Sequence, residues 1–391
     1  MKILLISDNY YPEVNALSNR STEHSKFWSQ NEEVVVLTCF PNHPTGKIFC
    51  KYKKKKIYSR EVYKNLTVIR VWSYIAKKKN SYLNFLDYLS FGISSFIVSI
   101  FIKCDIVIGS SPPMPVAFFS ILSAKIKGVK AILEVRDMWV ESINQLKISK
   151  SKIILNLLYF IEILMFKLSD KIICVTPSIK NQIVKKGIDK KRIVVRENGY
   201  SQNKQFNKIN IKLDKNKINI IYAGTIGFAQ NFEIIFNIAK HFKKKIDFYL
   251  IGDGSQASEI VEKLKNEKIK NVLLIKRNDD VMHKKLYQKF DYGISCLKNN
   301  KVFKTVIPSK LYDYAANNLP IIFLGPKGEA SQFIKKHSLG HSFNPNLSSL
   351  YENFSKIINK KKTSYDTSQR FRKLFTREKI AQNILYDIKK S

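Results

Sequence analysis

The segment SQNKQFNKINIKLDKNKINIIYAGTIG, residues 201–227, decides how the chain is divided. Its first part, residues 201–217, is polar and has almost no apolar pattern that could contribute to a core. The run INIIYAG that follows is continuous and apolar, which is typical of a parallel strand buried on both faces. The polar part therefore predicts a linker, and the apolar run predicts the first strand of a second domain.

Short runs rich in Ile, Val and Leu alternate with longer helical patterns on both sides of this linker. The runs that we predict to be strands are 2–7, 33–38, 66–72, 105–109, 130–136, 171–175, 192–196, 218–223, 246–251, 271–276, 291–296 and 320–324. The alternation predicts the α/β class, with two doubly wound, Rossmann-like domains that face each other across a cleft. Ligands of such sheets bind beyond the carboxyl ends of the strands.

The predicted domains are residues 1–205, residues 206–375 and a C-terminal helix, 376–391, that packs back on the first domain. The chain of 391 residues is 45% hydrophobic and 12% aromatic, which excludes a disordered or fibrous protein. The five cysteines form no CxxC pair, so we expect reduced thiols in a cytosolic protein and neither a disulfide framework nor a zinc site.

The charge is strongly basic, with 68 Lys and Arg against 31 Asp and Glu and a net charge of +37. One explanation is a polyanionic or membrane-surface partner. The other is a composition rich in Lys, Ile and Asn that spreads lysine over exposed positions. Both explanations stay open at this point.

Two stretches, 82–102 and 151–169, are the most apolar of the chain. The first is long enough to span a bilayer, but Asn84 and Asp87 interrupt it, so a buried or interfacial helix is expected and membrane insertion is the alternative. Lysine clusters at 53–56 and 77–79 would suit a protein that rests on an anionic leaflet. Ordinary core helices beside solvated lysine loops are the competing interpretation.

The first predicted strand is followed by DNYYPEVNALSNR, without a G-x-G-x-x-G motif, which counts against a dinucleotide-binding oxidoreductase. A helix is expected to begin near Ser18 with Arg20 in its first turn, where the two could hold a phosphate. A capped core helix with a surface arginine is the alternative.

The segment EVRDMWVES, residues 134–142, places ionisable side chains at the end of another predicted strand. Polar groups at this edge need partners or a ligand, so Arg136, Asp137 and Glu141 are candidate site residues. A structural network between Arg136 and Asp137 is the competing explanation.

In the second half, Gly224 and Gly227 bracket a turn after a strand, which would let the backbone approach a phosphate. IGDGS, residues 251–255, has the same form but is interpreted as a plain turn. A helix is expected to begin at the Pro308-Ser309 pair, with Lys310 in its first turn. Because a cation is unfavourable at the positive end of a helix, we expect a diphosphate beside Lys310.

Taken together and in order, these segments resemble glycosyltransferase family 4, the retaining enzymes with the two-domain GT-B fold. Within that family the chain is most similar to the branch of O-antigen, capsule and colanic-acid clusters, which includes L-fucosamine transferases. The segments that carry the resemblance are 8–20, 37–49, 106–115, 134–143, 197–200, 222–235, 251–255 and 308–320.

The resemblance implies three sets of site residues. The implied catalytic residues are Asp137, Arg136 and Lys310. The implied donor-binding residues are Asn15, Arg20, Gly224, Thr225, Arg277, Thr305, Ser309, Lys310, Leu311 and Asp313. The implied acceptor-side residues are Asn42, His43 and Glu141.

Two positions depart from the family pattern. Its E-x7-E motif would place two glutamates where this chain has Thr305 and Asp313, so the first carries no charge. A basic pair usually found after the glycine turn is replaced by Ile226 and by Gln230 or Asn231. These departures leave the sugar in doubt more than the activity.

The resemblance implies transfer of a sugar from a nucleoside diphosphate, UDP being favoured, with no metal ion or other cofactor. The implied acceptor is a polyprenyl-diphosphate-linked saccharide at the cytoplasmic face of an anionic inner membrane, and no nucleic acid is expected as a partner. Two rival functions are a non-catalytic basic protein that binds membranes or nucleic acid, and an NAD-dependent sugar-nucleotide epimerase.

Overall fold

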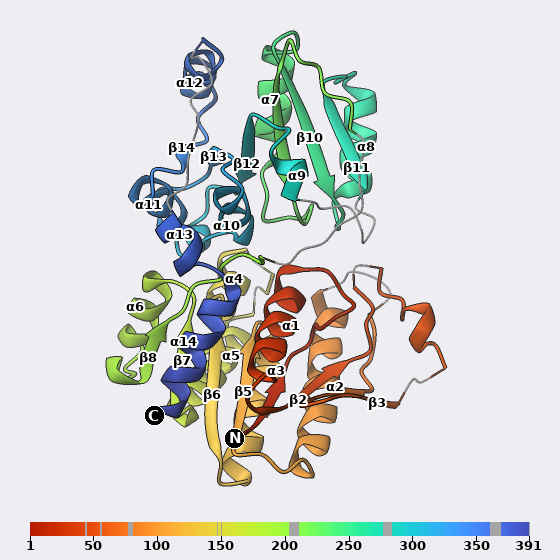
Figure 1. The fold of residues 1–391 in the computed structure, drawn as a ribbon, viewed down its shortest axis with the longest axis vertical. Coiled ribbons are helices and arrows are strands. Elements are labelled where there is room, and N and C mark those ends of the chain that lie inside the picture. The colour runs from red at the N-terminus through yellow and green to blue at the C-terminus, as the bar shows by residue number, and fades with distance from the viewer. Residues whose placement is uncertain are drawn as a thin grey trace. The chain divides into compact units, whose positions relative to one another are not determined.

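The computed structural model describes residues 1–43, 45–54, 57–76, 81–146, 148–149, 151–202, 211–276, 284–359 and 369–390. The chain forms two compact units, each with its own sheet (Figure 1). The first unit contains Met1–Asn198 and Arg377–Ser391, and the second contains Gly199–Thr376. Two units built on parallel strands confirm the predicted α/β class.

The sheet of the first unit has the strand order β3-β4-β2-β1-β5-β6-β7-β8. Its strands are β1 Lys2–Ile6, β2 Glu33–Cys39, β3 Tyr58–Tyr63, β4 Leu66–Val71, β5 Ile106–Ser111, β6 Lys130–Val135, β7 Lys171–Cys174 and β8 Ile193–Val195. All neighbours pair in parallel except β3 and β4. The seven predicted strands of this half are confirmed, whereas β3 was missed because YSREVY is polar and largely exposed.

Helices cover both faces of this sheet. They are α1 Ala16–Trp28, α2 Ser81–Ile100, α3 Met114–Ile126, α4 Trp139–Gln145, α5 Lys152–Leu168, α6 Pro177–Lys185 and α14 Arg377–Lys389. One core contains residues of α2, α3, α4, α5 and α6, and a second core lies under α1 and α14. The indole N–H of Trp28 in α1 donates to the carbonyl oxygen of Ala381 in α14 at 2.9 Å. The last helix is thus part of the first unit.

The sheet of the second unit is parallel throughout, in the order β11-β10-β9-β12-β13-β14. Its strands are β9 Ile218–Ala223, β10 Ile246–Gly252, β11 Val272–Lys276, β12 Tyr292–Cys296, β13 Ile321–Leu324 and β14 Gly340–Phe343. Its helices are α7 Phe232–His241, α8 Ala257–Asn266, α9 Lys284–Tyr287, α10 Ser309–Ala316, α11 Glu329–Lys336, α12 Leu347–Asn359 and α13 Gln369–Leu374. The five predicted strands form, and the short edge strand β14 was missed because GHSF has no apolar run.

The units divide between Asn198 and Gly199, earlier than the predicted boundary at 205/206. The backbone N–H of Tyr200 donates to the carbonyl oxygen of Phe375 at 2.9 Å, and Tyr200 pairs with Thr376 in a parallel bridge. Because both partners belong to the second unit, the chain has joined that unit before the polar segment begins.

Helix α2 is the one described helix that is long and apolar enough to cross a bilayer, over Tyr82–Ile100, judged by length and composition alone. It also packs closely inside the first unit, because a Cβ on Gly92 would lie 2.8 Å from Cδ2 of Phe119 in α3. Phe91, Ser95 and Ser99 on the packed side are fully buried. The opposite side is open, since Ile93 and Ile97 are exposed, so one face of α2 packs in the first unit and the other does not.

Candidate functional site

Two glycine turns pack against each other at the carboxyl ends of β9 and β10. A Cβ on Gly252 would lie 2.0 Å from the carbonyl oxygen of Gly224, and one on Gly254 would lie 2.2 Å from that of Ile226. Gly224 itself has φ +141°, a conformation that other residues rarely adopt. IGDGS is therefore the structural support of the 224–227 turn, which refines its interpretation as a plain turn.

Lys310 lies directly beneath this turn. A Cβ on Gly224 would lie 3.3 Å from Nζ of Lys310, and that Nζ lies 3.3 Å from the centre of the Tyr222 ring. No carboxylate among the described residues forms an ion pair with it. Burial lowers the pKa of Lys310 to about 7, and the nearby Cys296 thiol opposes this shift only in part. The lysine is therefore a partly desolvated cation without an acidic partner.

Tyr314 fixes α10, and with it Lys310, under the glycine turn. Its hydroxyl accepts a hydrogen bond from the backbone N–H of Ala223 at 2.8 Å, where β9 ends. A Cβ on Gly293 would lie 2.6 Å from the Tyr314 ring, so β12 has room for that ring only because residue 293 is glycine. Leu311, one of the predicted donor-binding residues, is fully buried and anchors the same helix.

The first turn of α10 lacks a side-chain cap from the residue before it. Pro308, the residue before the helix, makes no side-chain capping bond, so the first N–H groups at Ser309 and Lys310 have no cap from the residue that usually provides one. Backbone N–H groups and the positive end of a helix favour an anion. This helix start, Lys310 and the glycine turn form one anion-binding constellation.

The other donor-binding residues predicted for the second unit have no contact with Lys310 that the structure describes. Thr225 is exposed beside Gly224, and its carbonyl oxygen accepts from the Tyr222 hydroxyl at 2.6 Å. The Thr305 hydroxyl donates to the carbonyl oxygen of Val302 at 2.9 Å, within its own 3-10 turn. Asp313 is partly buried one turn after Ser309, and Arg277 lies outside the described residues.

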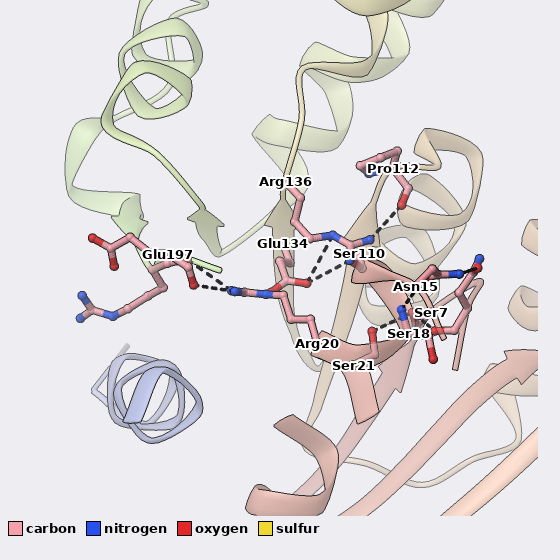
Figure 2. Close-up of polar contacts among 12 residues, drawn as sticks. Ser7, Asn15, Ser18, Arg20, Ser21, Ser110, Pro112, Glu134, Arg136 and Glu197 are labelled. Carbon is pink, nitrogen blue, oxygen red and sulfur yellow. Dashed lines mark hydrogen bonds and ion pairs between the residues drawn. The ribbon is translucent and has the colours of Figure 1, made fainter. Parts of the chain in front are cut away.

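In the first unit, Arg20 is engaged entirely by protein groups (Figure 2). Its Nε donates to Oε1 of Glu134 at 2.7 Å, and its Nη1 donates to the carbonyl oxygen of Glu197 at 2.6 Å. Its Nη2 donates to the carbonyl oxygen of Arg196 at 3.3 Å, and the side chain is 2% exposed. Arg20 is therefore held in place by protein groups, and its assignment to donor binding stays a prediction.

Glu134 lies between Arg20 and a second arginine, Arg136 (Figure 2). Nε of Arg136 is 4.0 Å from Oε2 of Glu134, and its Nη2 donates to the carbonyl oxygen of Pro112 at 3.1 Å. Burial alone would raise the pKa of Glu134, but the charges of the two arginines outweigh it and lower that pKa to about 2. Nε and Nη1 of Arg136 are buried and have no hydrogen-bond partner among the described residues.

Asp137 and Glu141 follow on the same segment and differ in their surroundings. Burial raises the pKa of Asp137 to about 6, and its Oδ1 has no hydrogen-bond partner in the described part of the chain. Glu141 instead forms an ion pair with Lys186 at 2.6 Å, and Lys186 also contacts Glu162 at 2.5 Å. Asp137 can therefore exchange a proton near neutral pH, whereas Glu141 is held in a structural pair.

The predicted acceptor-side residues Asn42 and His43 lie in a loop that a buried carboxylate organises. The backbone N–H groups of both donate to Oε1 of Glu13 at 2.8 Å. Burial raises the pKa of Glu13 to about 7. Asn15 caps α1, because its Oδ1 accepts from the backbone N–H of Ser18 at 2.8 Å. Sequence reasoning missed Glu13, since nothing in YPEVN distinguishes it from a surface glutamate.

No three His, Cys, Asp or Glu side chains of the described residues are grouped in a way that could hold a metal ion. The structure thus brings Gly224, Ser309 and Lys310 together in the second unit. It brings Arg136 and Asp137 to the carboxyl end of β6 in the first.

Residues 29–204 match the model of the family described as Glycosyltransferase Family 4. No curated protein matches the chain by sequence. Similar solved structures include HepE of Anabaena in complex with UDP-glucose, with 11% identity, full coverage of both chains and a TM-score of 0.68. The sucrose-phosphate synthase of Thermosynechococcus elongatus has 12% identity, coverage of 100% of this chain and 98% of its own, and a TM-score of 0.71.

A third similar structure is the lipopolysaccharide outer core galactosyltransferase WaaB, with 15% identity, 99% coverage of both chains and a TM-score of 0.59. At these identities the likeness establishes the fold, and the family match over residues 29–204 adds the class of enzyme. The chain is therefore a glycosyltransferase with the GT-B fold, and its residues 29–204 match the model of glycosyltransferase family 4.

Proposed function

We propose that this protein is a retaining, metal-independent glycosyltransferase of bacterial surface polysaccharide biosynthesis, of the O-antigen or capsule type. It moves a sugar from a nucleoside diphosphate, UDP being favoured, to a polyprenyl-diphosphate-linked saccharide. An N-acetylated deoxyhexosamine such as L-fucosamine is the candidate sugar. The observation that carries the proposal is the position of Lys310, under the Gly224 turn and at an uncapped helix start, with no ion-pair partner in the described part of the chain.

A nucleoside diphosphate fits the chemistry of this constellation. Its phosphates need cations and N–H donors, and a glycine turn lets them approach the backbone closely. HepE, which has the same fold, was solved with UDP-glucose, UDP, and UDP with glucose. WaaB is a galactosyltransferase of the lipopolysaccharide outer core, which supports a role in bacterial glycan synthesis.

In the proposed reaction the bond between the anomeric carbon and the diphosphate oxygen breaks, and negative charge develops on the leaving phosphate. Protonated Lys310 and the first N–H groups of α10 stabilise that charge. The departing phosphate oxygen accepts the proton of the attacking hydroxyl group, so the step balances without a further base. Attack on the same face as the departing diphosphate retains the anomeric configuration and needs no carboxylate nucleophile.

We further propose peripheral attachment to the inner face of the cytoplasmic membrane. The support is an exposed apolar face on α5, where Ile153 is 82% exposed, Leu157 57% and Phe160 64%. Lys152 is exposed at the start of that helix, and lysines near an anionic leaflet favour binding. Of the lysine clusters noted in the sequence, 55–56 and 77–79 lie outside the described residues.

The donor is tested by calorimetric titration and thermal shift with UDP, GDP and TDP, since a ligand of the folded state raises its stability. We expect UDP to bind most tightly, in EDTA as well as in Mg²⁺. Product analysis by NMR then gives the anomeric configuration. Absence of binding by all three nucleotides, or an inverted product, would contradict the proposal.

Sedimentation with liposomes tests the membrane partner. Binding to phosphatidylglycerol liposomes should be clear at low salt and weaker at high salt, because salt screens the lysines. Aspartate at Leu157 and Phe160 should abolish it, while aspartate at Ile57 and Val62 of the β3 region, which are at least about as exposed, should not. Attachment that resists both salt and carbonate would instead indicate an inserted helix.

A further inference from the structure

The second unit contains a lysine-lined pocket, far from the proposed donor site. Its volume is about 560 Å³, and six of its nine lining residues are lysines, although Lys and Arg together supply only 68 of the 391 residues. The lining residues are Lys217, Lys240, Lys243, Lys244, Glu267, Lys268, Ile269, Lys270 and Asn271.

The pocket lies at the amino edge of the sheet. Its residues directly precede β9, β10 and β11, whereas Gly224 and Gly252 follow the carboxyl ends of β9 and β10. A strand of this length separates the two edges by roughly 20 Å. The pocket is therefore not part of the site around Lys310.

The floor of the pocket is a fixed part of the fold. The side-chain amide of Asn271 is buried and donates to the carbonyl oxygens of Ala239 at 2.9 Å and Ile246 at 2.8 Å. These bonds join the segment before β11 to the end of α7 and to the start of β10. The lysines around this floor are thus presented by a rigid frame.

Two of the six lysines are neutralised by carboxylates. Lys217 pairs with Asp247 at 2.9 Å, and Lys240 pairs with Glu267 at 2.6 Å. The carboxyl-terminal ends of α7 and α8 also lie at this edge and favour cations, which accounts for part of the cluster.

The other four, Lys243, Lys244, Lys268 and Lys270, are exposed and form no ion pair within the described ranges. Lys268 even has φ +52°, a conformation for which glycine is preferred. A surplus of cations around one concave space is what a multiply charged anion requires.

We propose that this pocket is a second anion site, which binds a ligand carrying two or more phosphate groups. A soluble polyphosphate and a cluster of phospholipid headgroups share this chemistry, and the experiment distinguishes them. The site is independent of the donor and of the reaction proposed above.

The test uses the full chain and two probes, inorganic tripolyphosphate in calorimetric titration and phosphatidylglycerol vesicles in sedimentation. The pocket variant combines Lys243→Gln, Lys244→Gln, Lys268→Gln and Lys270→Gln. The control variant combines Lys289→Gln, Lys335→Gln, Lys336→Gln and Lys373→Gln, which removes the same charge from exposed positions of the same unit. Lys310→Gln identifies any tripolyphosphate bound at the donor site.

We expect the pocket variant to bind at least one probe about tenfold more weakly or worse, while the control and Lys310→Gln change little. Loss of tripolyphosphate binding identifies a soluble ligand, and loss confined to vesicles identifies headgroups. UDP binding by the pocket variant should be unchanged, which separates this site from the donor site. Equal weakening by the pocket and control variants, or no binding of either probe by the wild type, overturns the proposal.

Discussion

Arg20 and Lys310 are both cations in the first turn or two of a helix that follows a parallel strand, yet the two units treat them differently. In the first unit every nitrogen of the Arg20 guanidinium has a protein partner, and the side chain is 2% exposed. In the second unit Lys310 faces a ring and a glycine turn and has no carboxylate partner among the described residues. Removing a buried cation that is bonded to protein groups destabilises the fold, because its partner is left unpaired. A buried cation without a carboxylate partner is instead a candidate to bind an anionic ligand.

The largest effect that tests this comparison is on stability. Arg20→Ala leaves Glu134 buried beside only one arginine, and breaking a buried pair typically costs about 3–5 kcal/mol. We expect a large fall in the free energy of unfolding, measured by urea denaturation, with UDP affinity unchanged in the fraction that stays folded. Lys125→Ala, which breaks the more exposed pair with Asp170, is the control and should cost less than about 1 kcal/mol. A specific loss of UDP affinity in stable Arg20→Ala protein would instead support a role of Arg20 in donor binding.

Lys310→Ala should affect activity and not stability, which is the reverse of the result expected for Arg20→Ala. Turnover should fall by ~10²–10³, as when one donor to transition-state charge is removed, while stability stays the same or rises because a desolvated cation is gone. Steady-state kinetics and urea denaturation on the same preparation measure both quantities. Lys335→Ala, an exposed lysine of the same unit, serves as the control. Near-wild-type turnover in folded Lys310→Ala protein would refute the role of this lysine.

Gly224→Ala sharpens the comparison because it keeps the charge of Lys310 and changes only the space between that lysine and the glycine turn. The new Cβ would lie 3.3 Å from Nζ of Lys310, at a residue with φ +141°. We expect UDP to bind about tenfold more weakly, with a stability loss of roughly 1–2 kcal/mol from the backbone conformation. Gly187→Ala has φ +86° and open space around it, so it should share the stability loss and keep the affinity. Equal UDP affinity in both variants would show that the turn does not contact the donor.

The smallest expected effect is the number of protons that the protein takes up when UDP binds. At pH 8 the free protein holds Lys310 largely neutral, because burial lowers its pKa to about 7, and a bound diphosphate favours the ammonium form. UDP binding at pH 8 should therefore take up as much as about one proton, measured by calorimetry in two buffers of different ionisation enthalpy. Lys310→Met should take up none.

The same pKa predicts how stability depends on pH. Between about pH 7 and 10.5 the unfolded chain keeps a proton on Lys310 that the folded chain has lost, so this residue makes stability rise with pH in that window. The stability of the wild type relative to Lys310→Met should rise across this window. A constant difference would show that Lys310 is fully solvated.

The comparison also shows what the sequence could predict. All twelve predicted strands form, because continuous Ile and Val runs reflect burial on both faces. Strands β3 and β14 were missed since edge strands lack that signal. Lys310 was predicted from a local conflict, a cation at the positive end of a helix. Arg20 presented the same local signal, but its partner Glu134 lies 114 residues away, so only the folded chain could show that it is satisfied.

The placement of α14 has a consequence for biosynthesis. Ile380, Ile384 and Ile388 complete a core with Ile3 and Leu5 of β1, yet the whole of Gly199–Thr376 is synthesised between them. At about 5–20 residues per second, the ribosome leaves that apolar face of the first unit uncovered for roughly 10–35 s. The second unit is contiguous and can close its own sheet first. The first unit therefore begins to fold first but is completed after the second, and the nascent chain must keep one face of its first sheet from aggregating until α14 emerges.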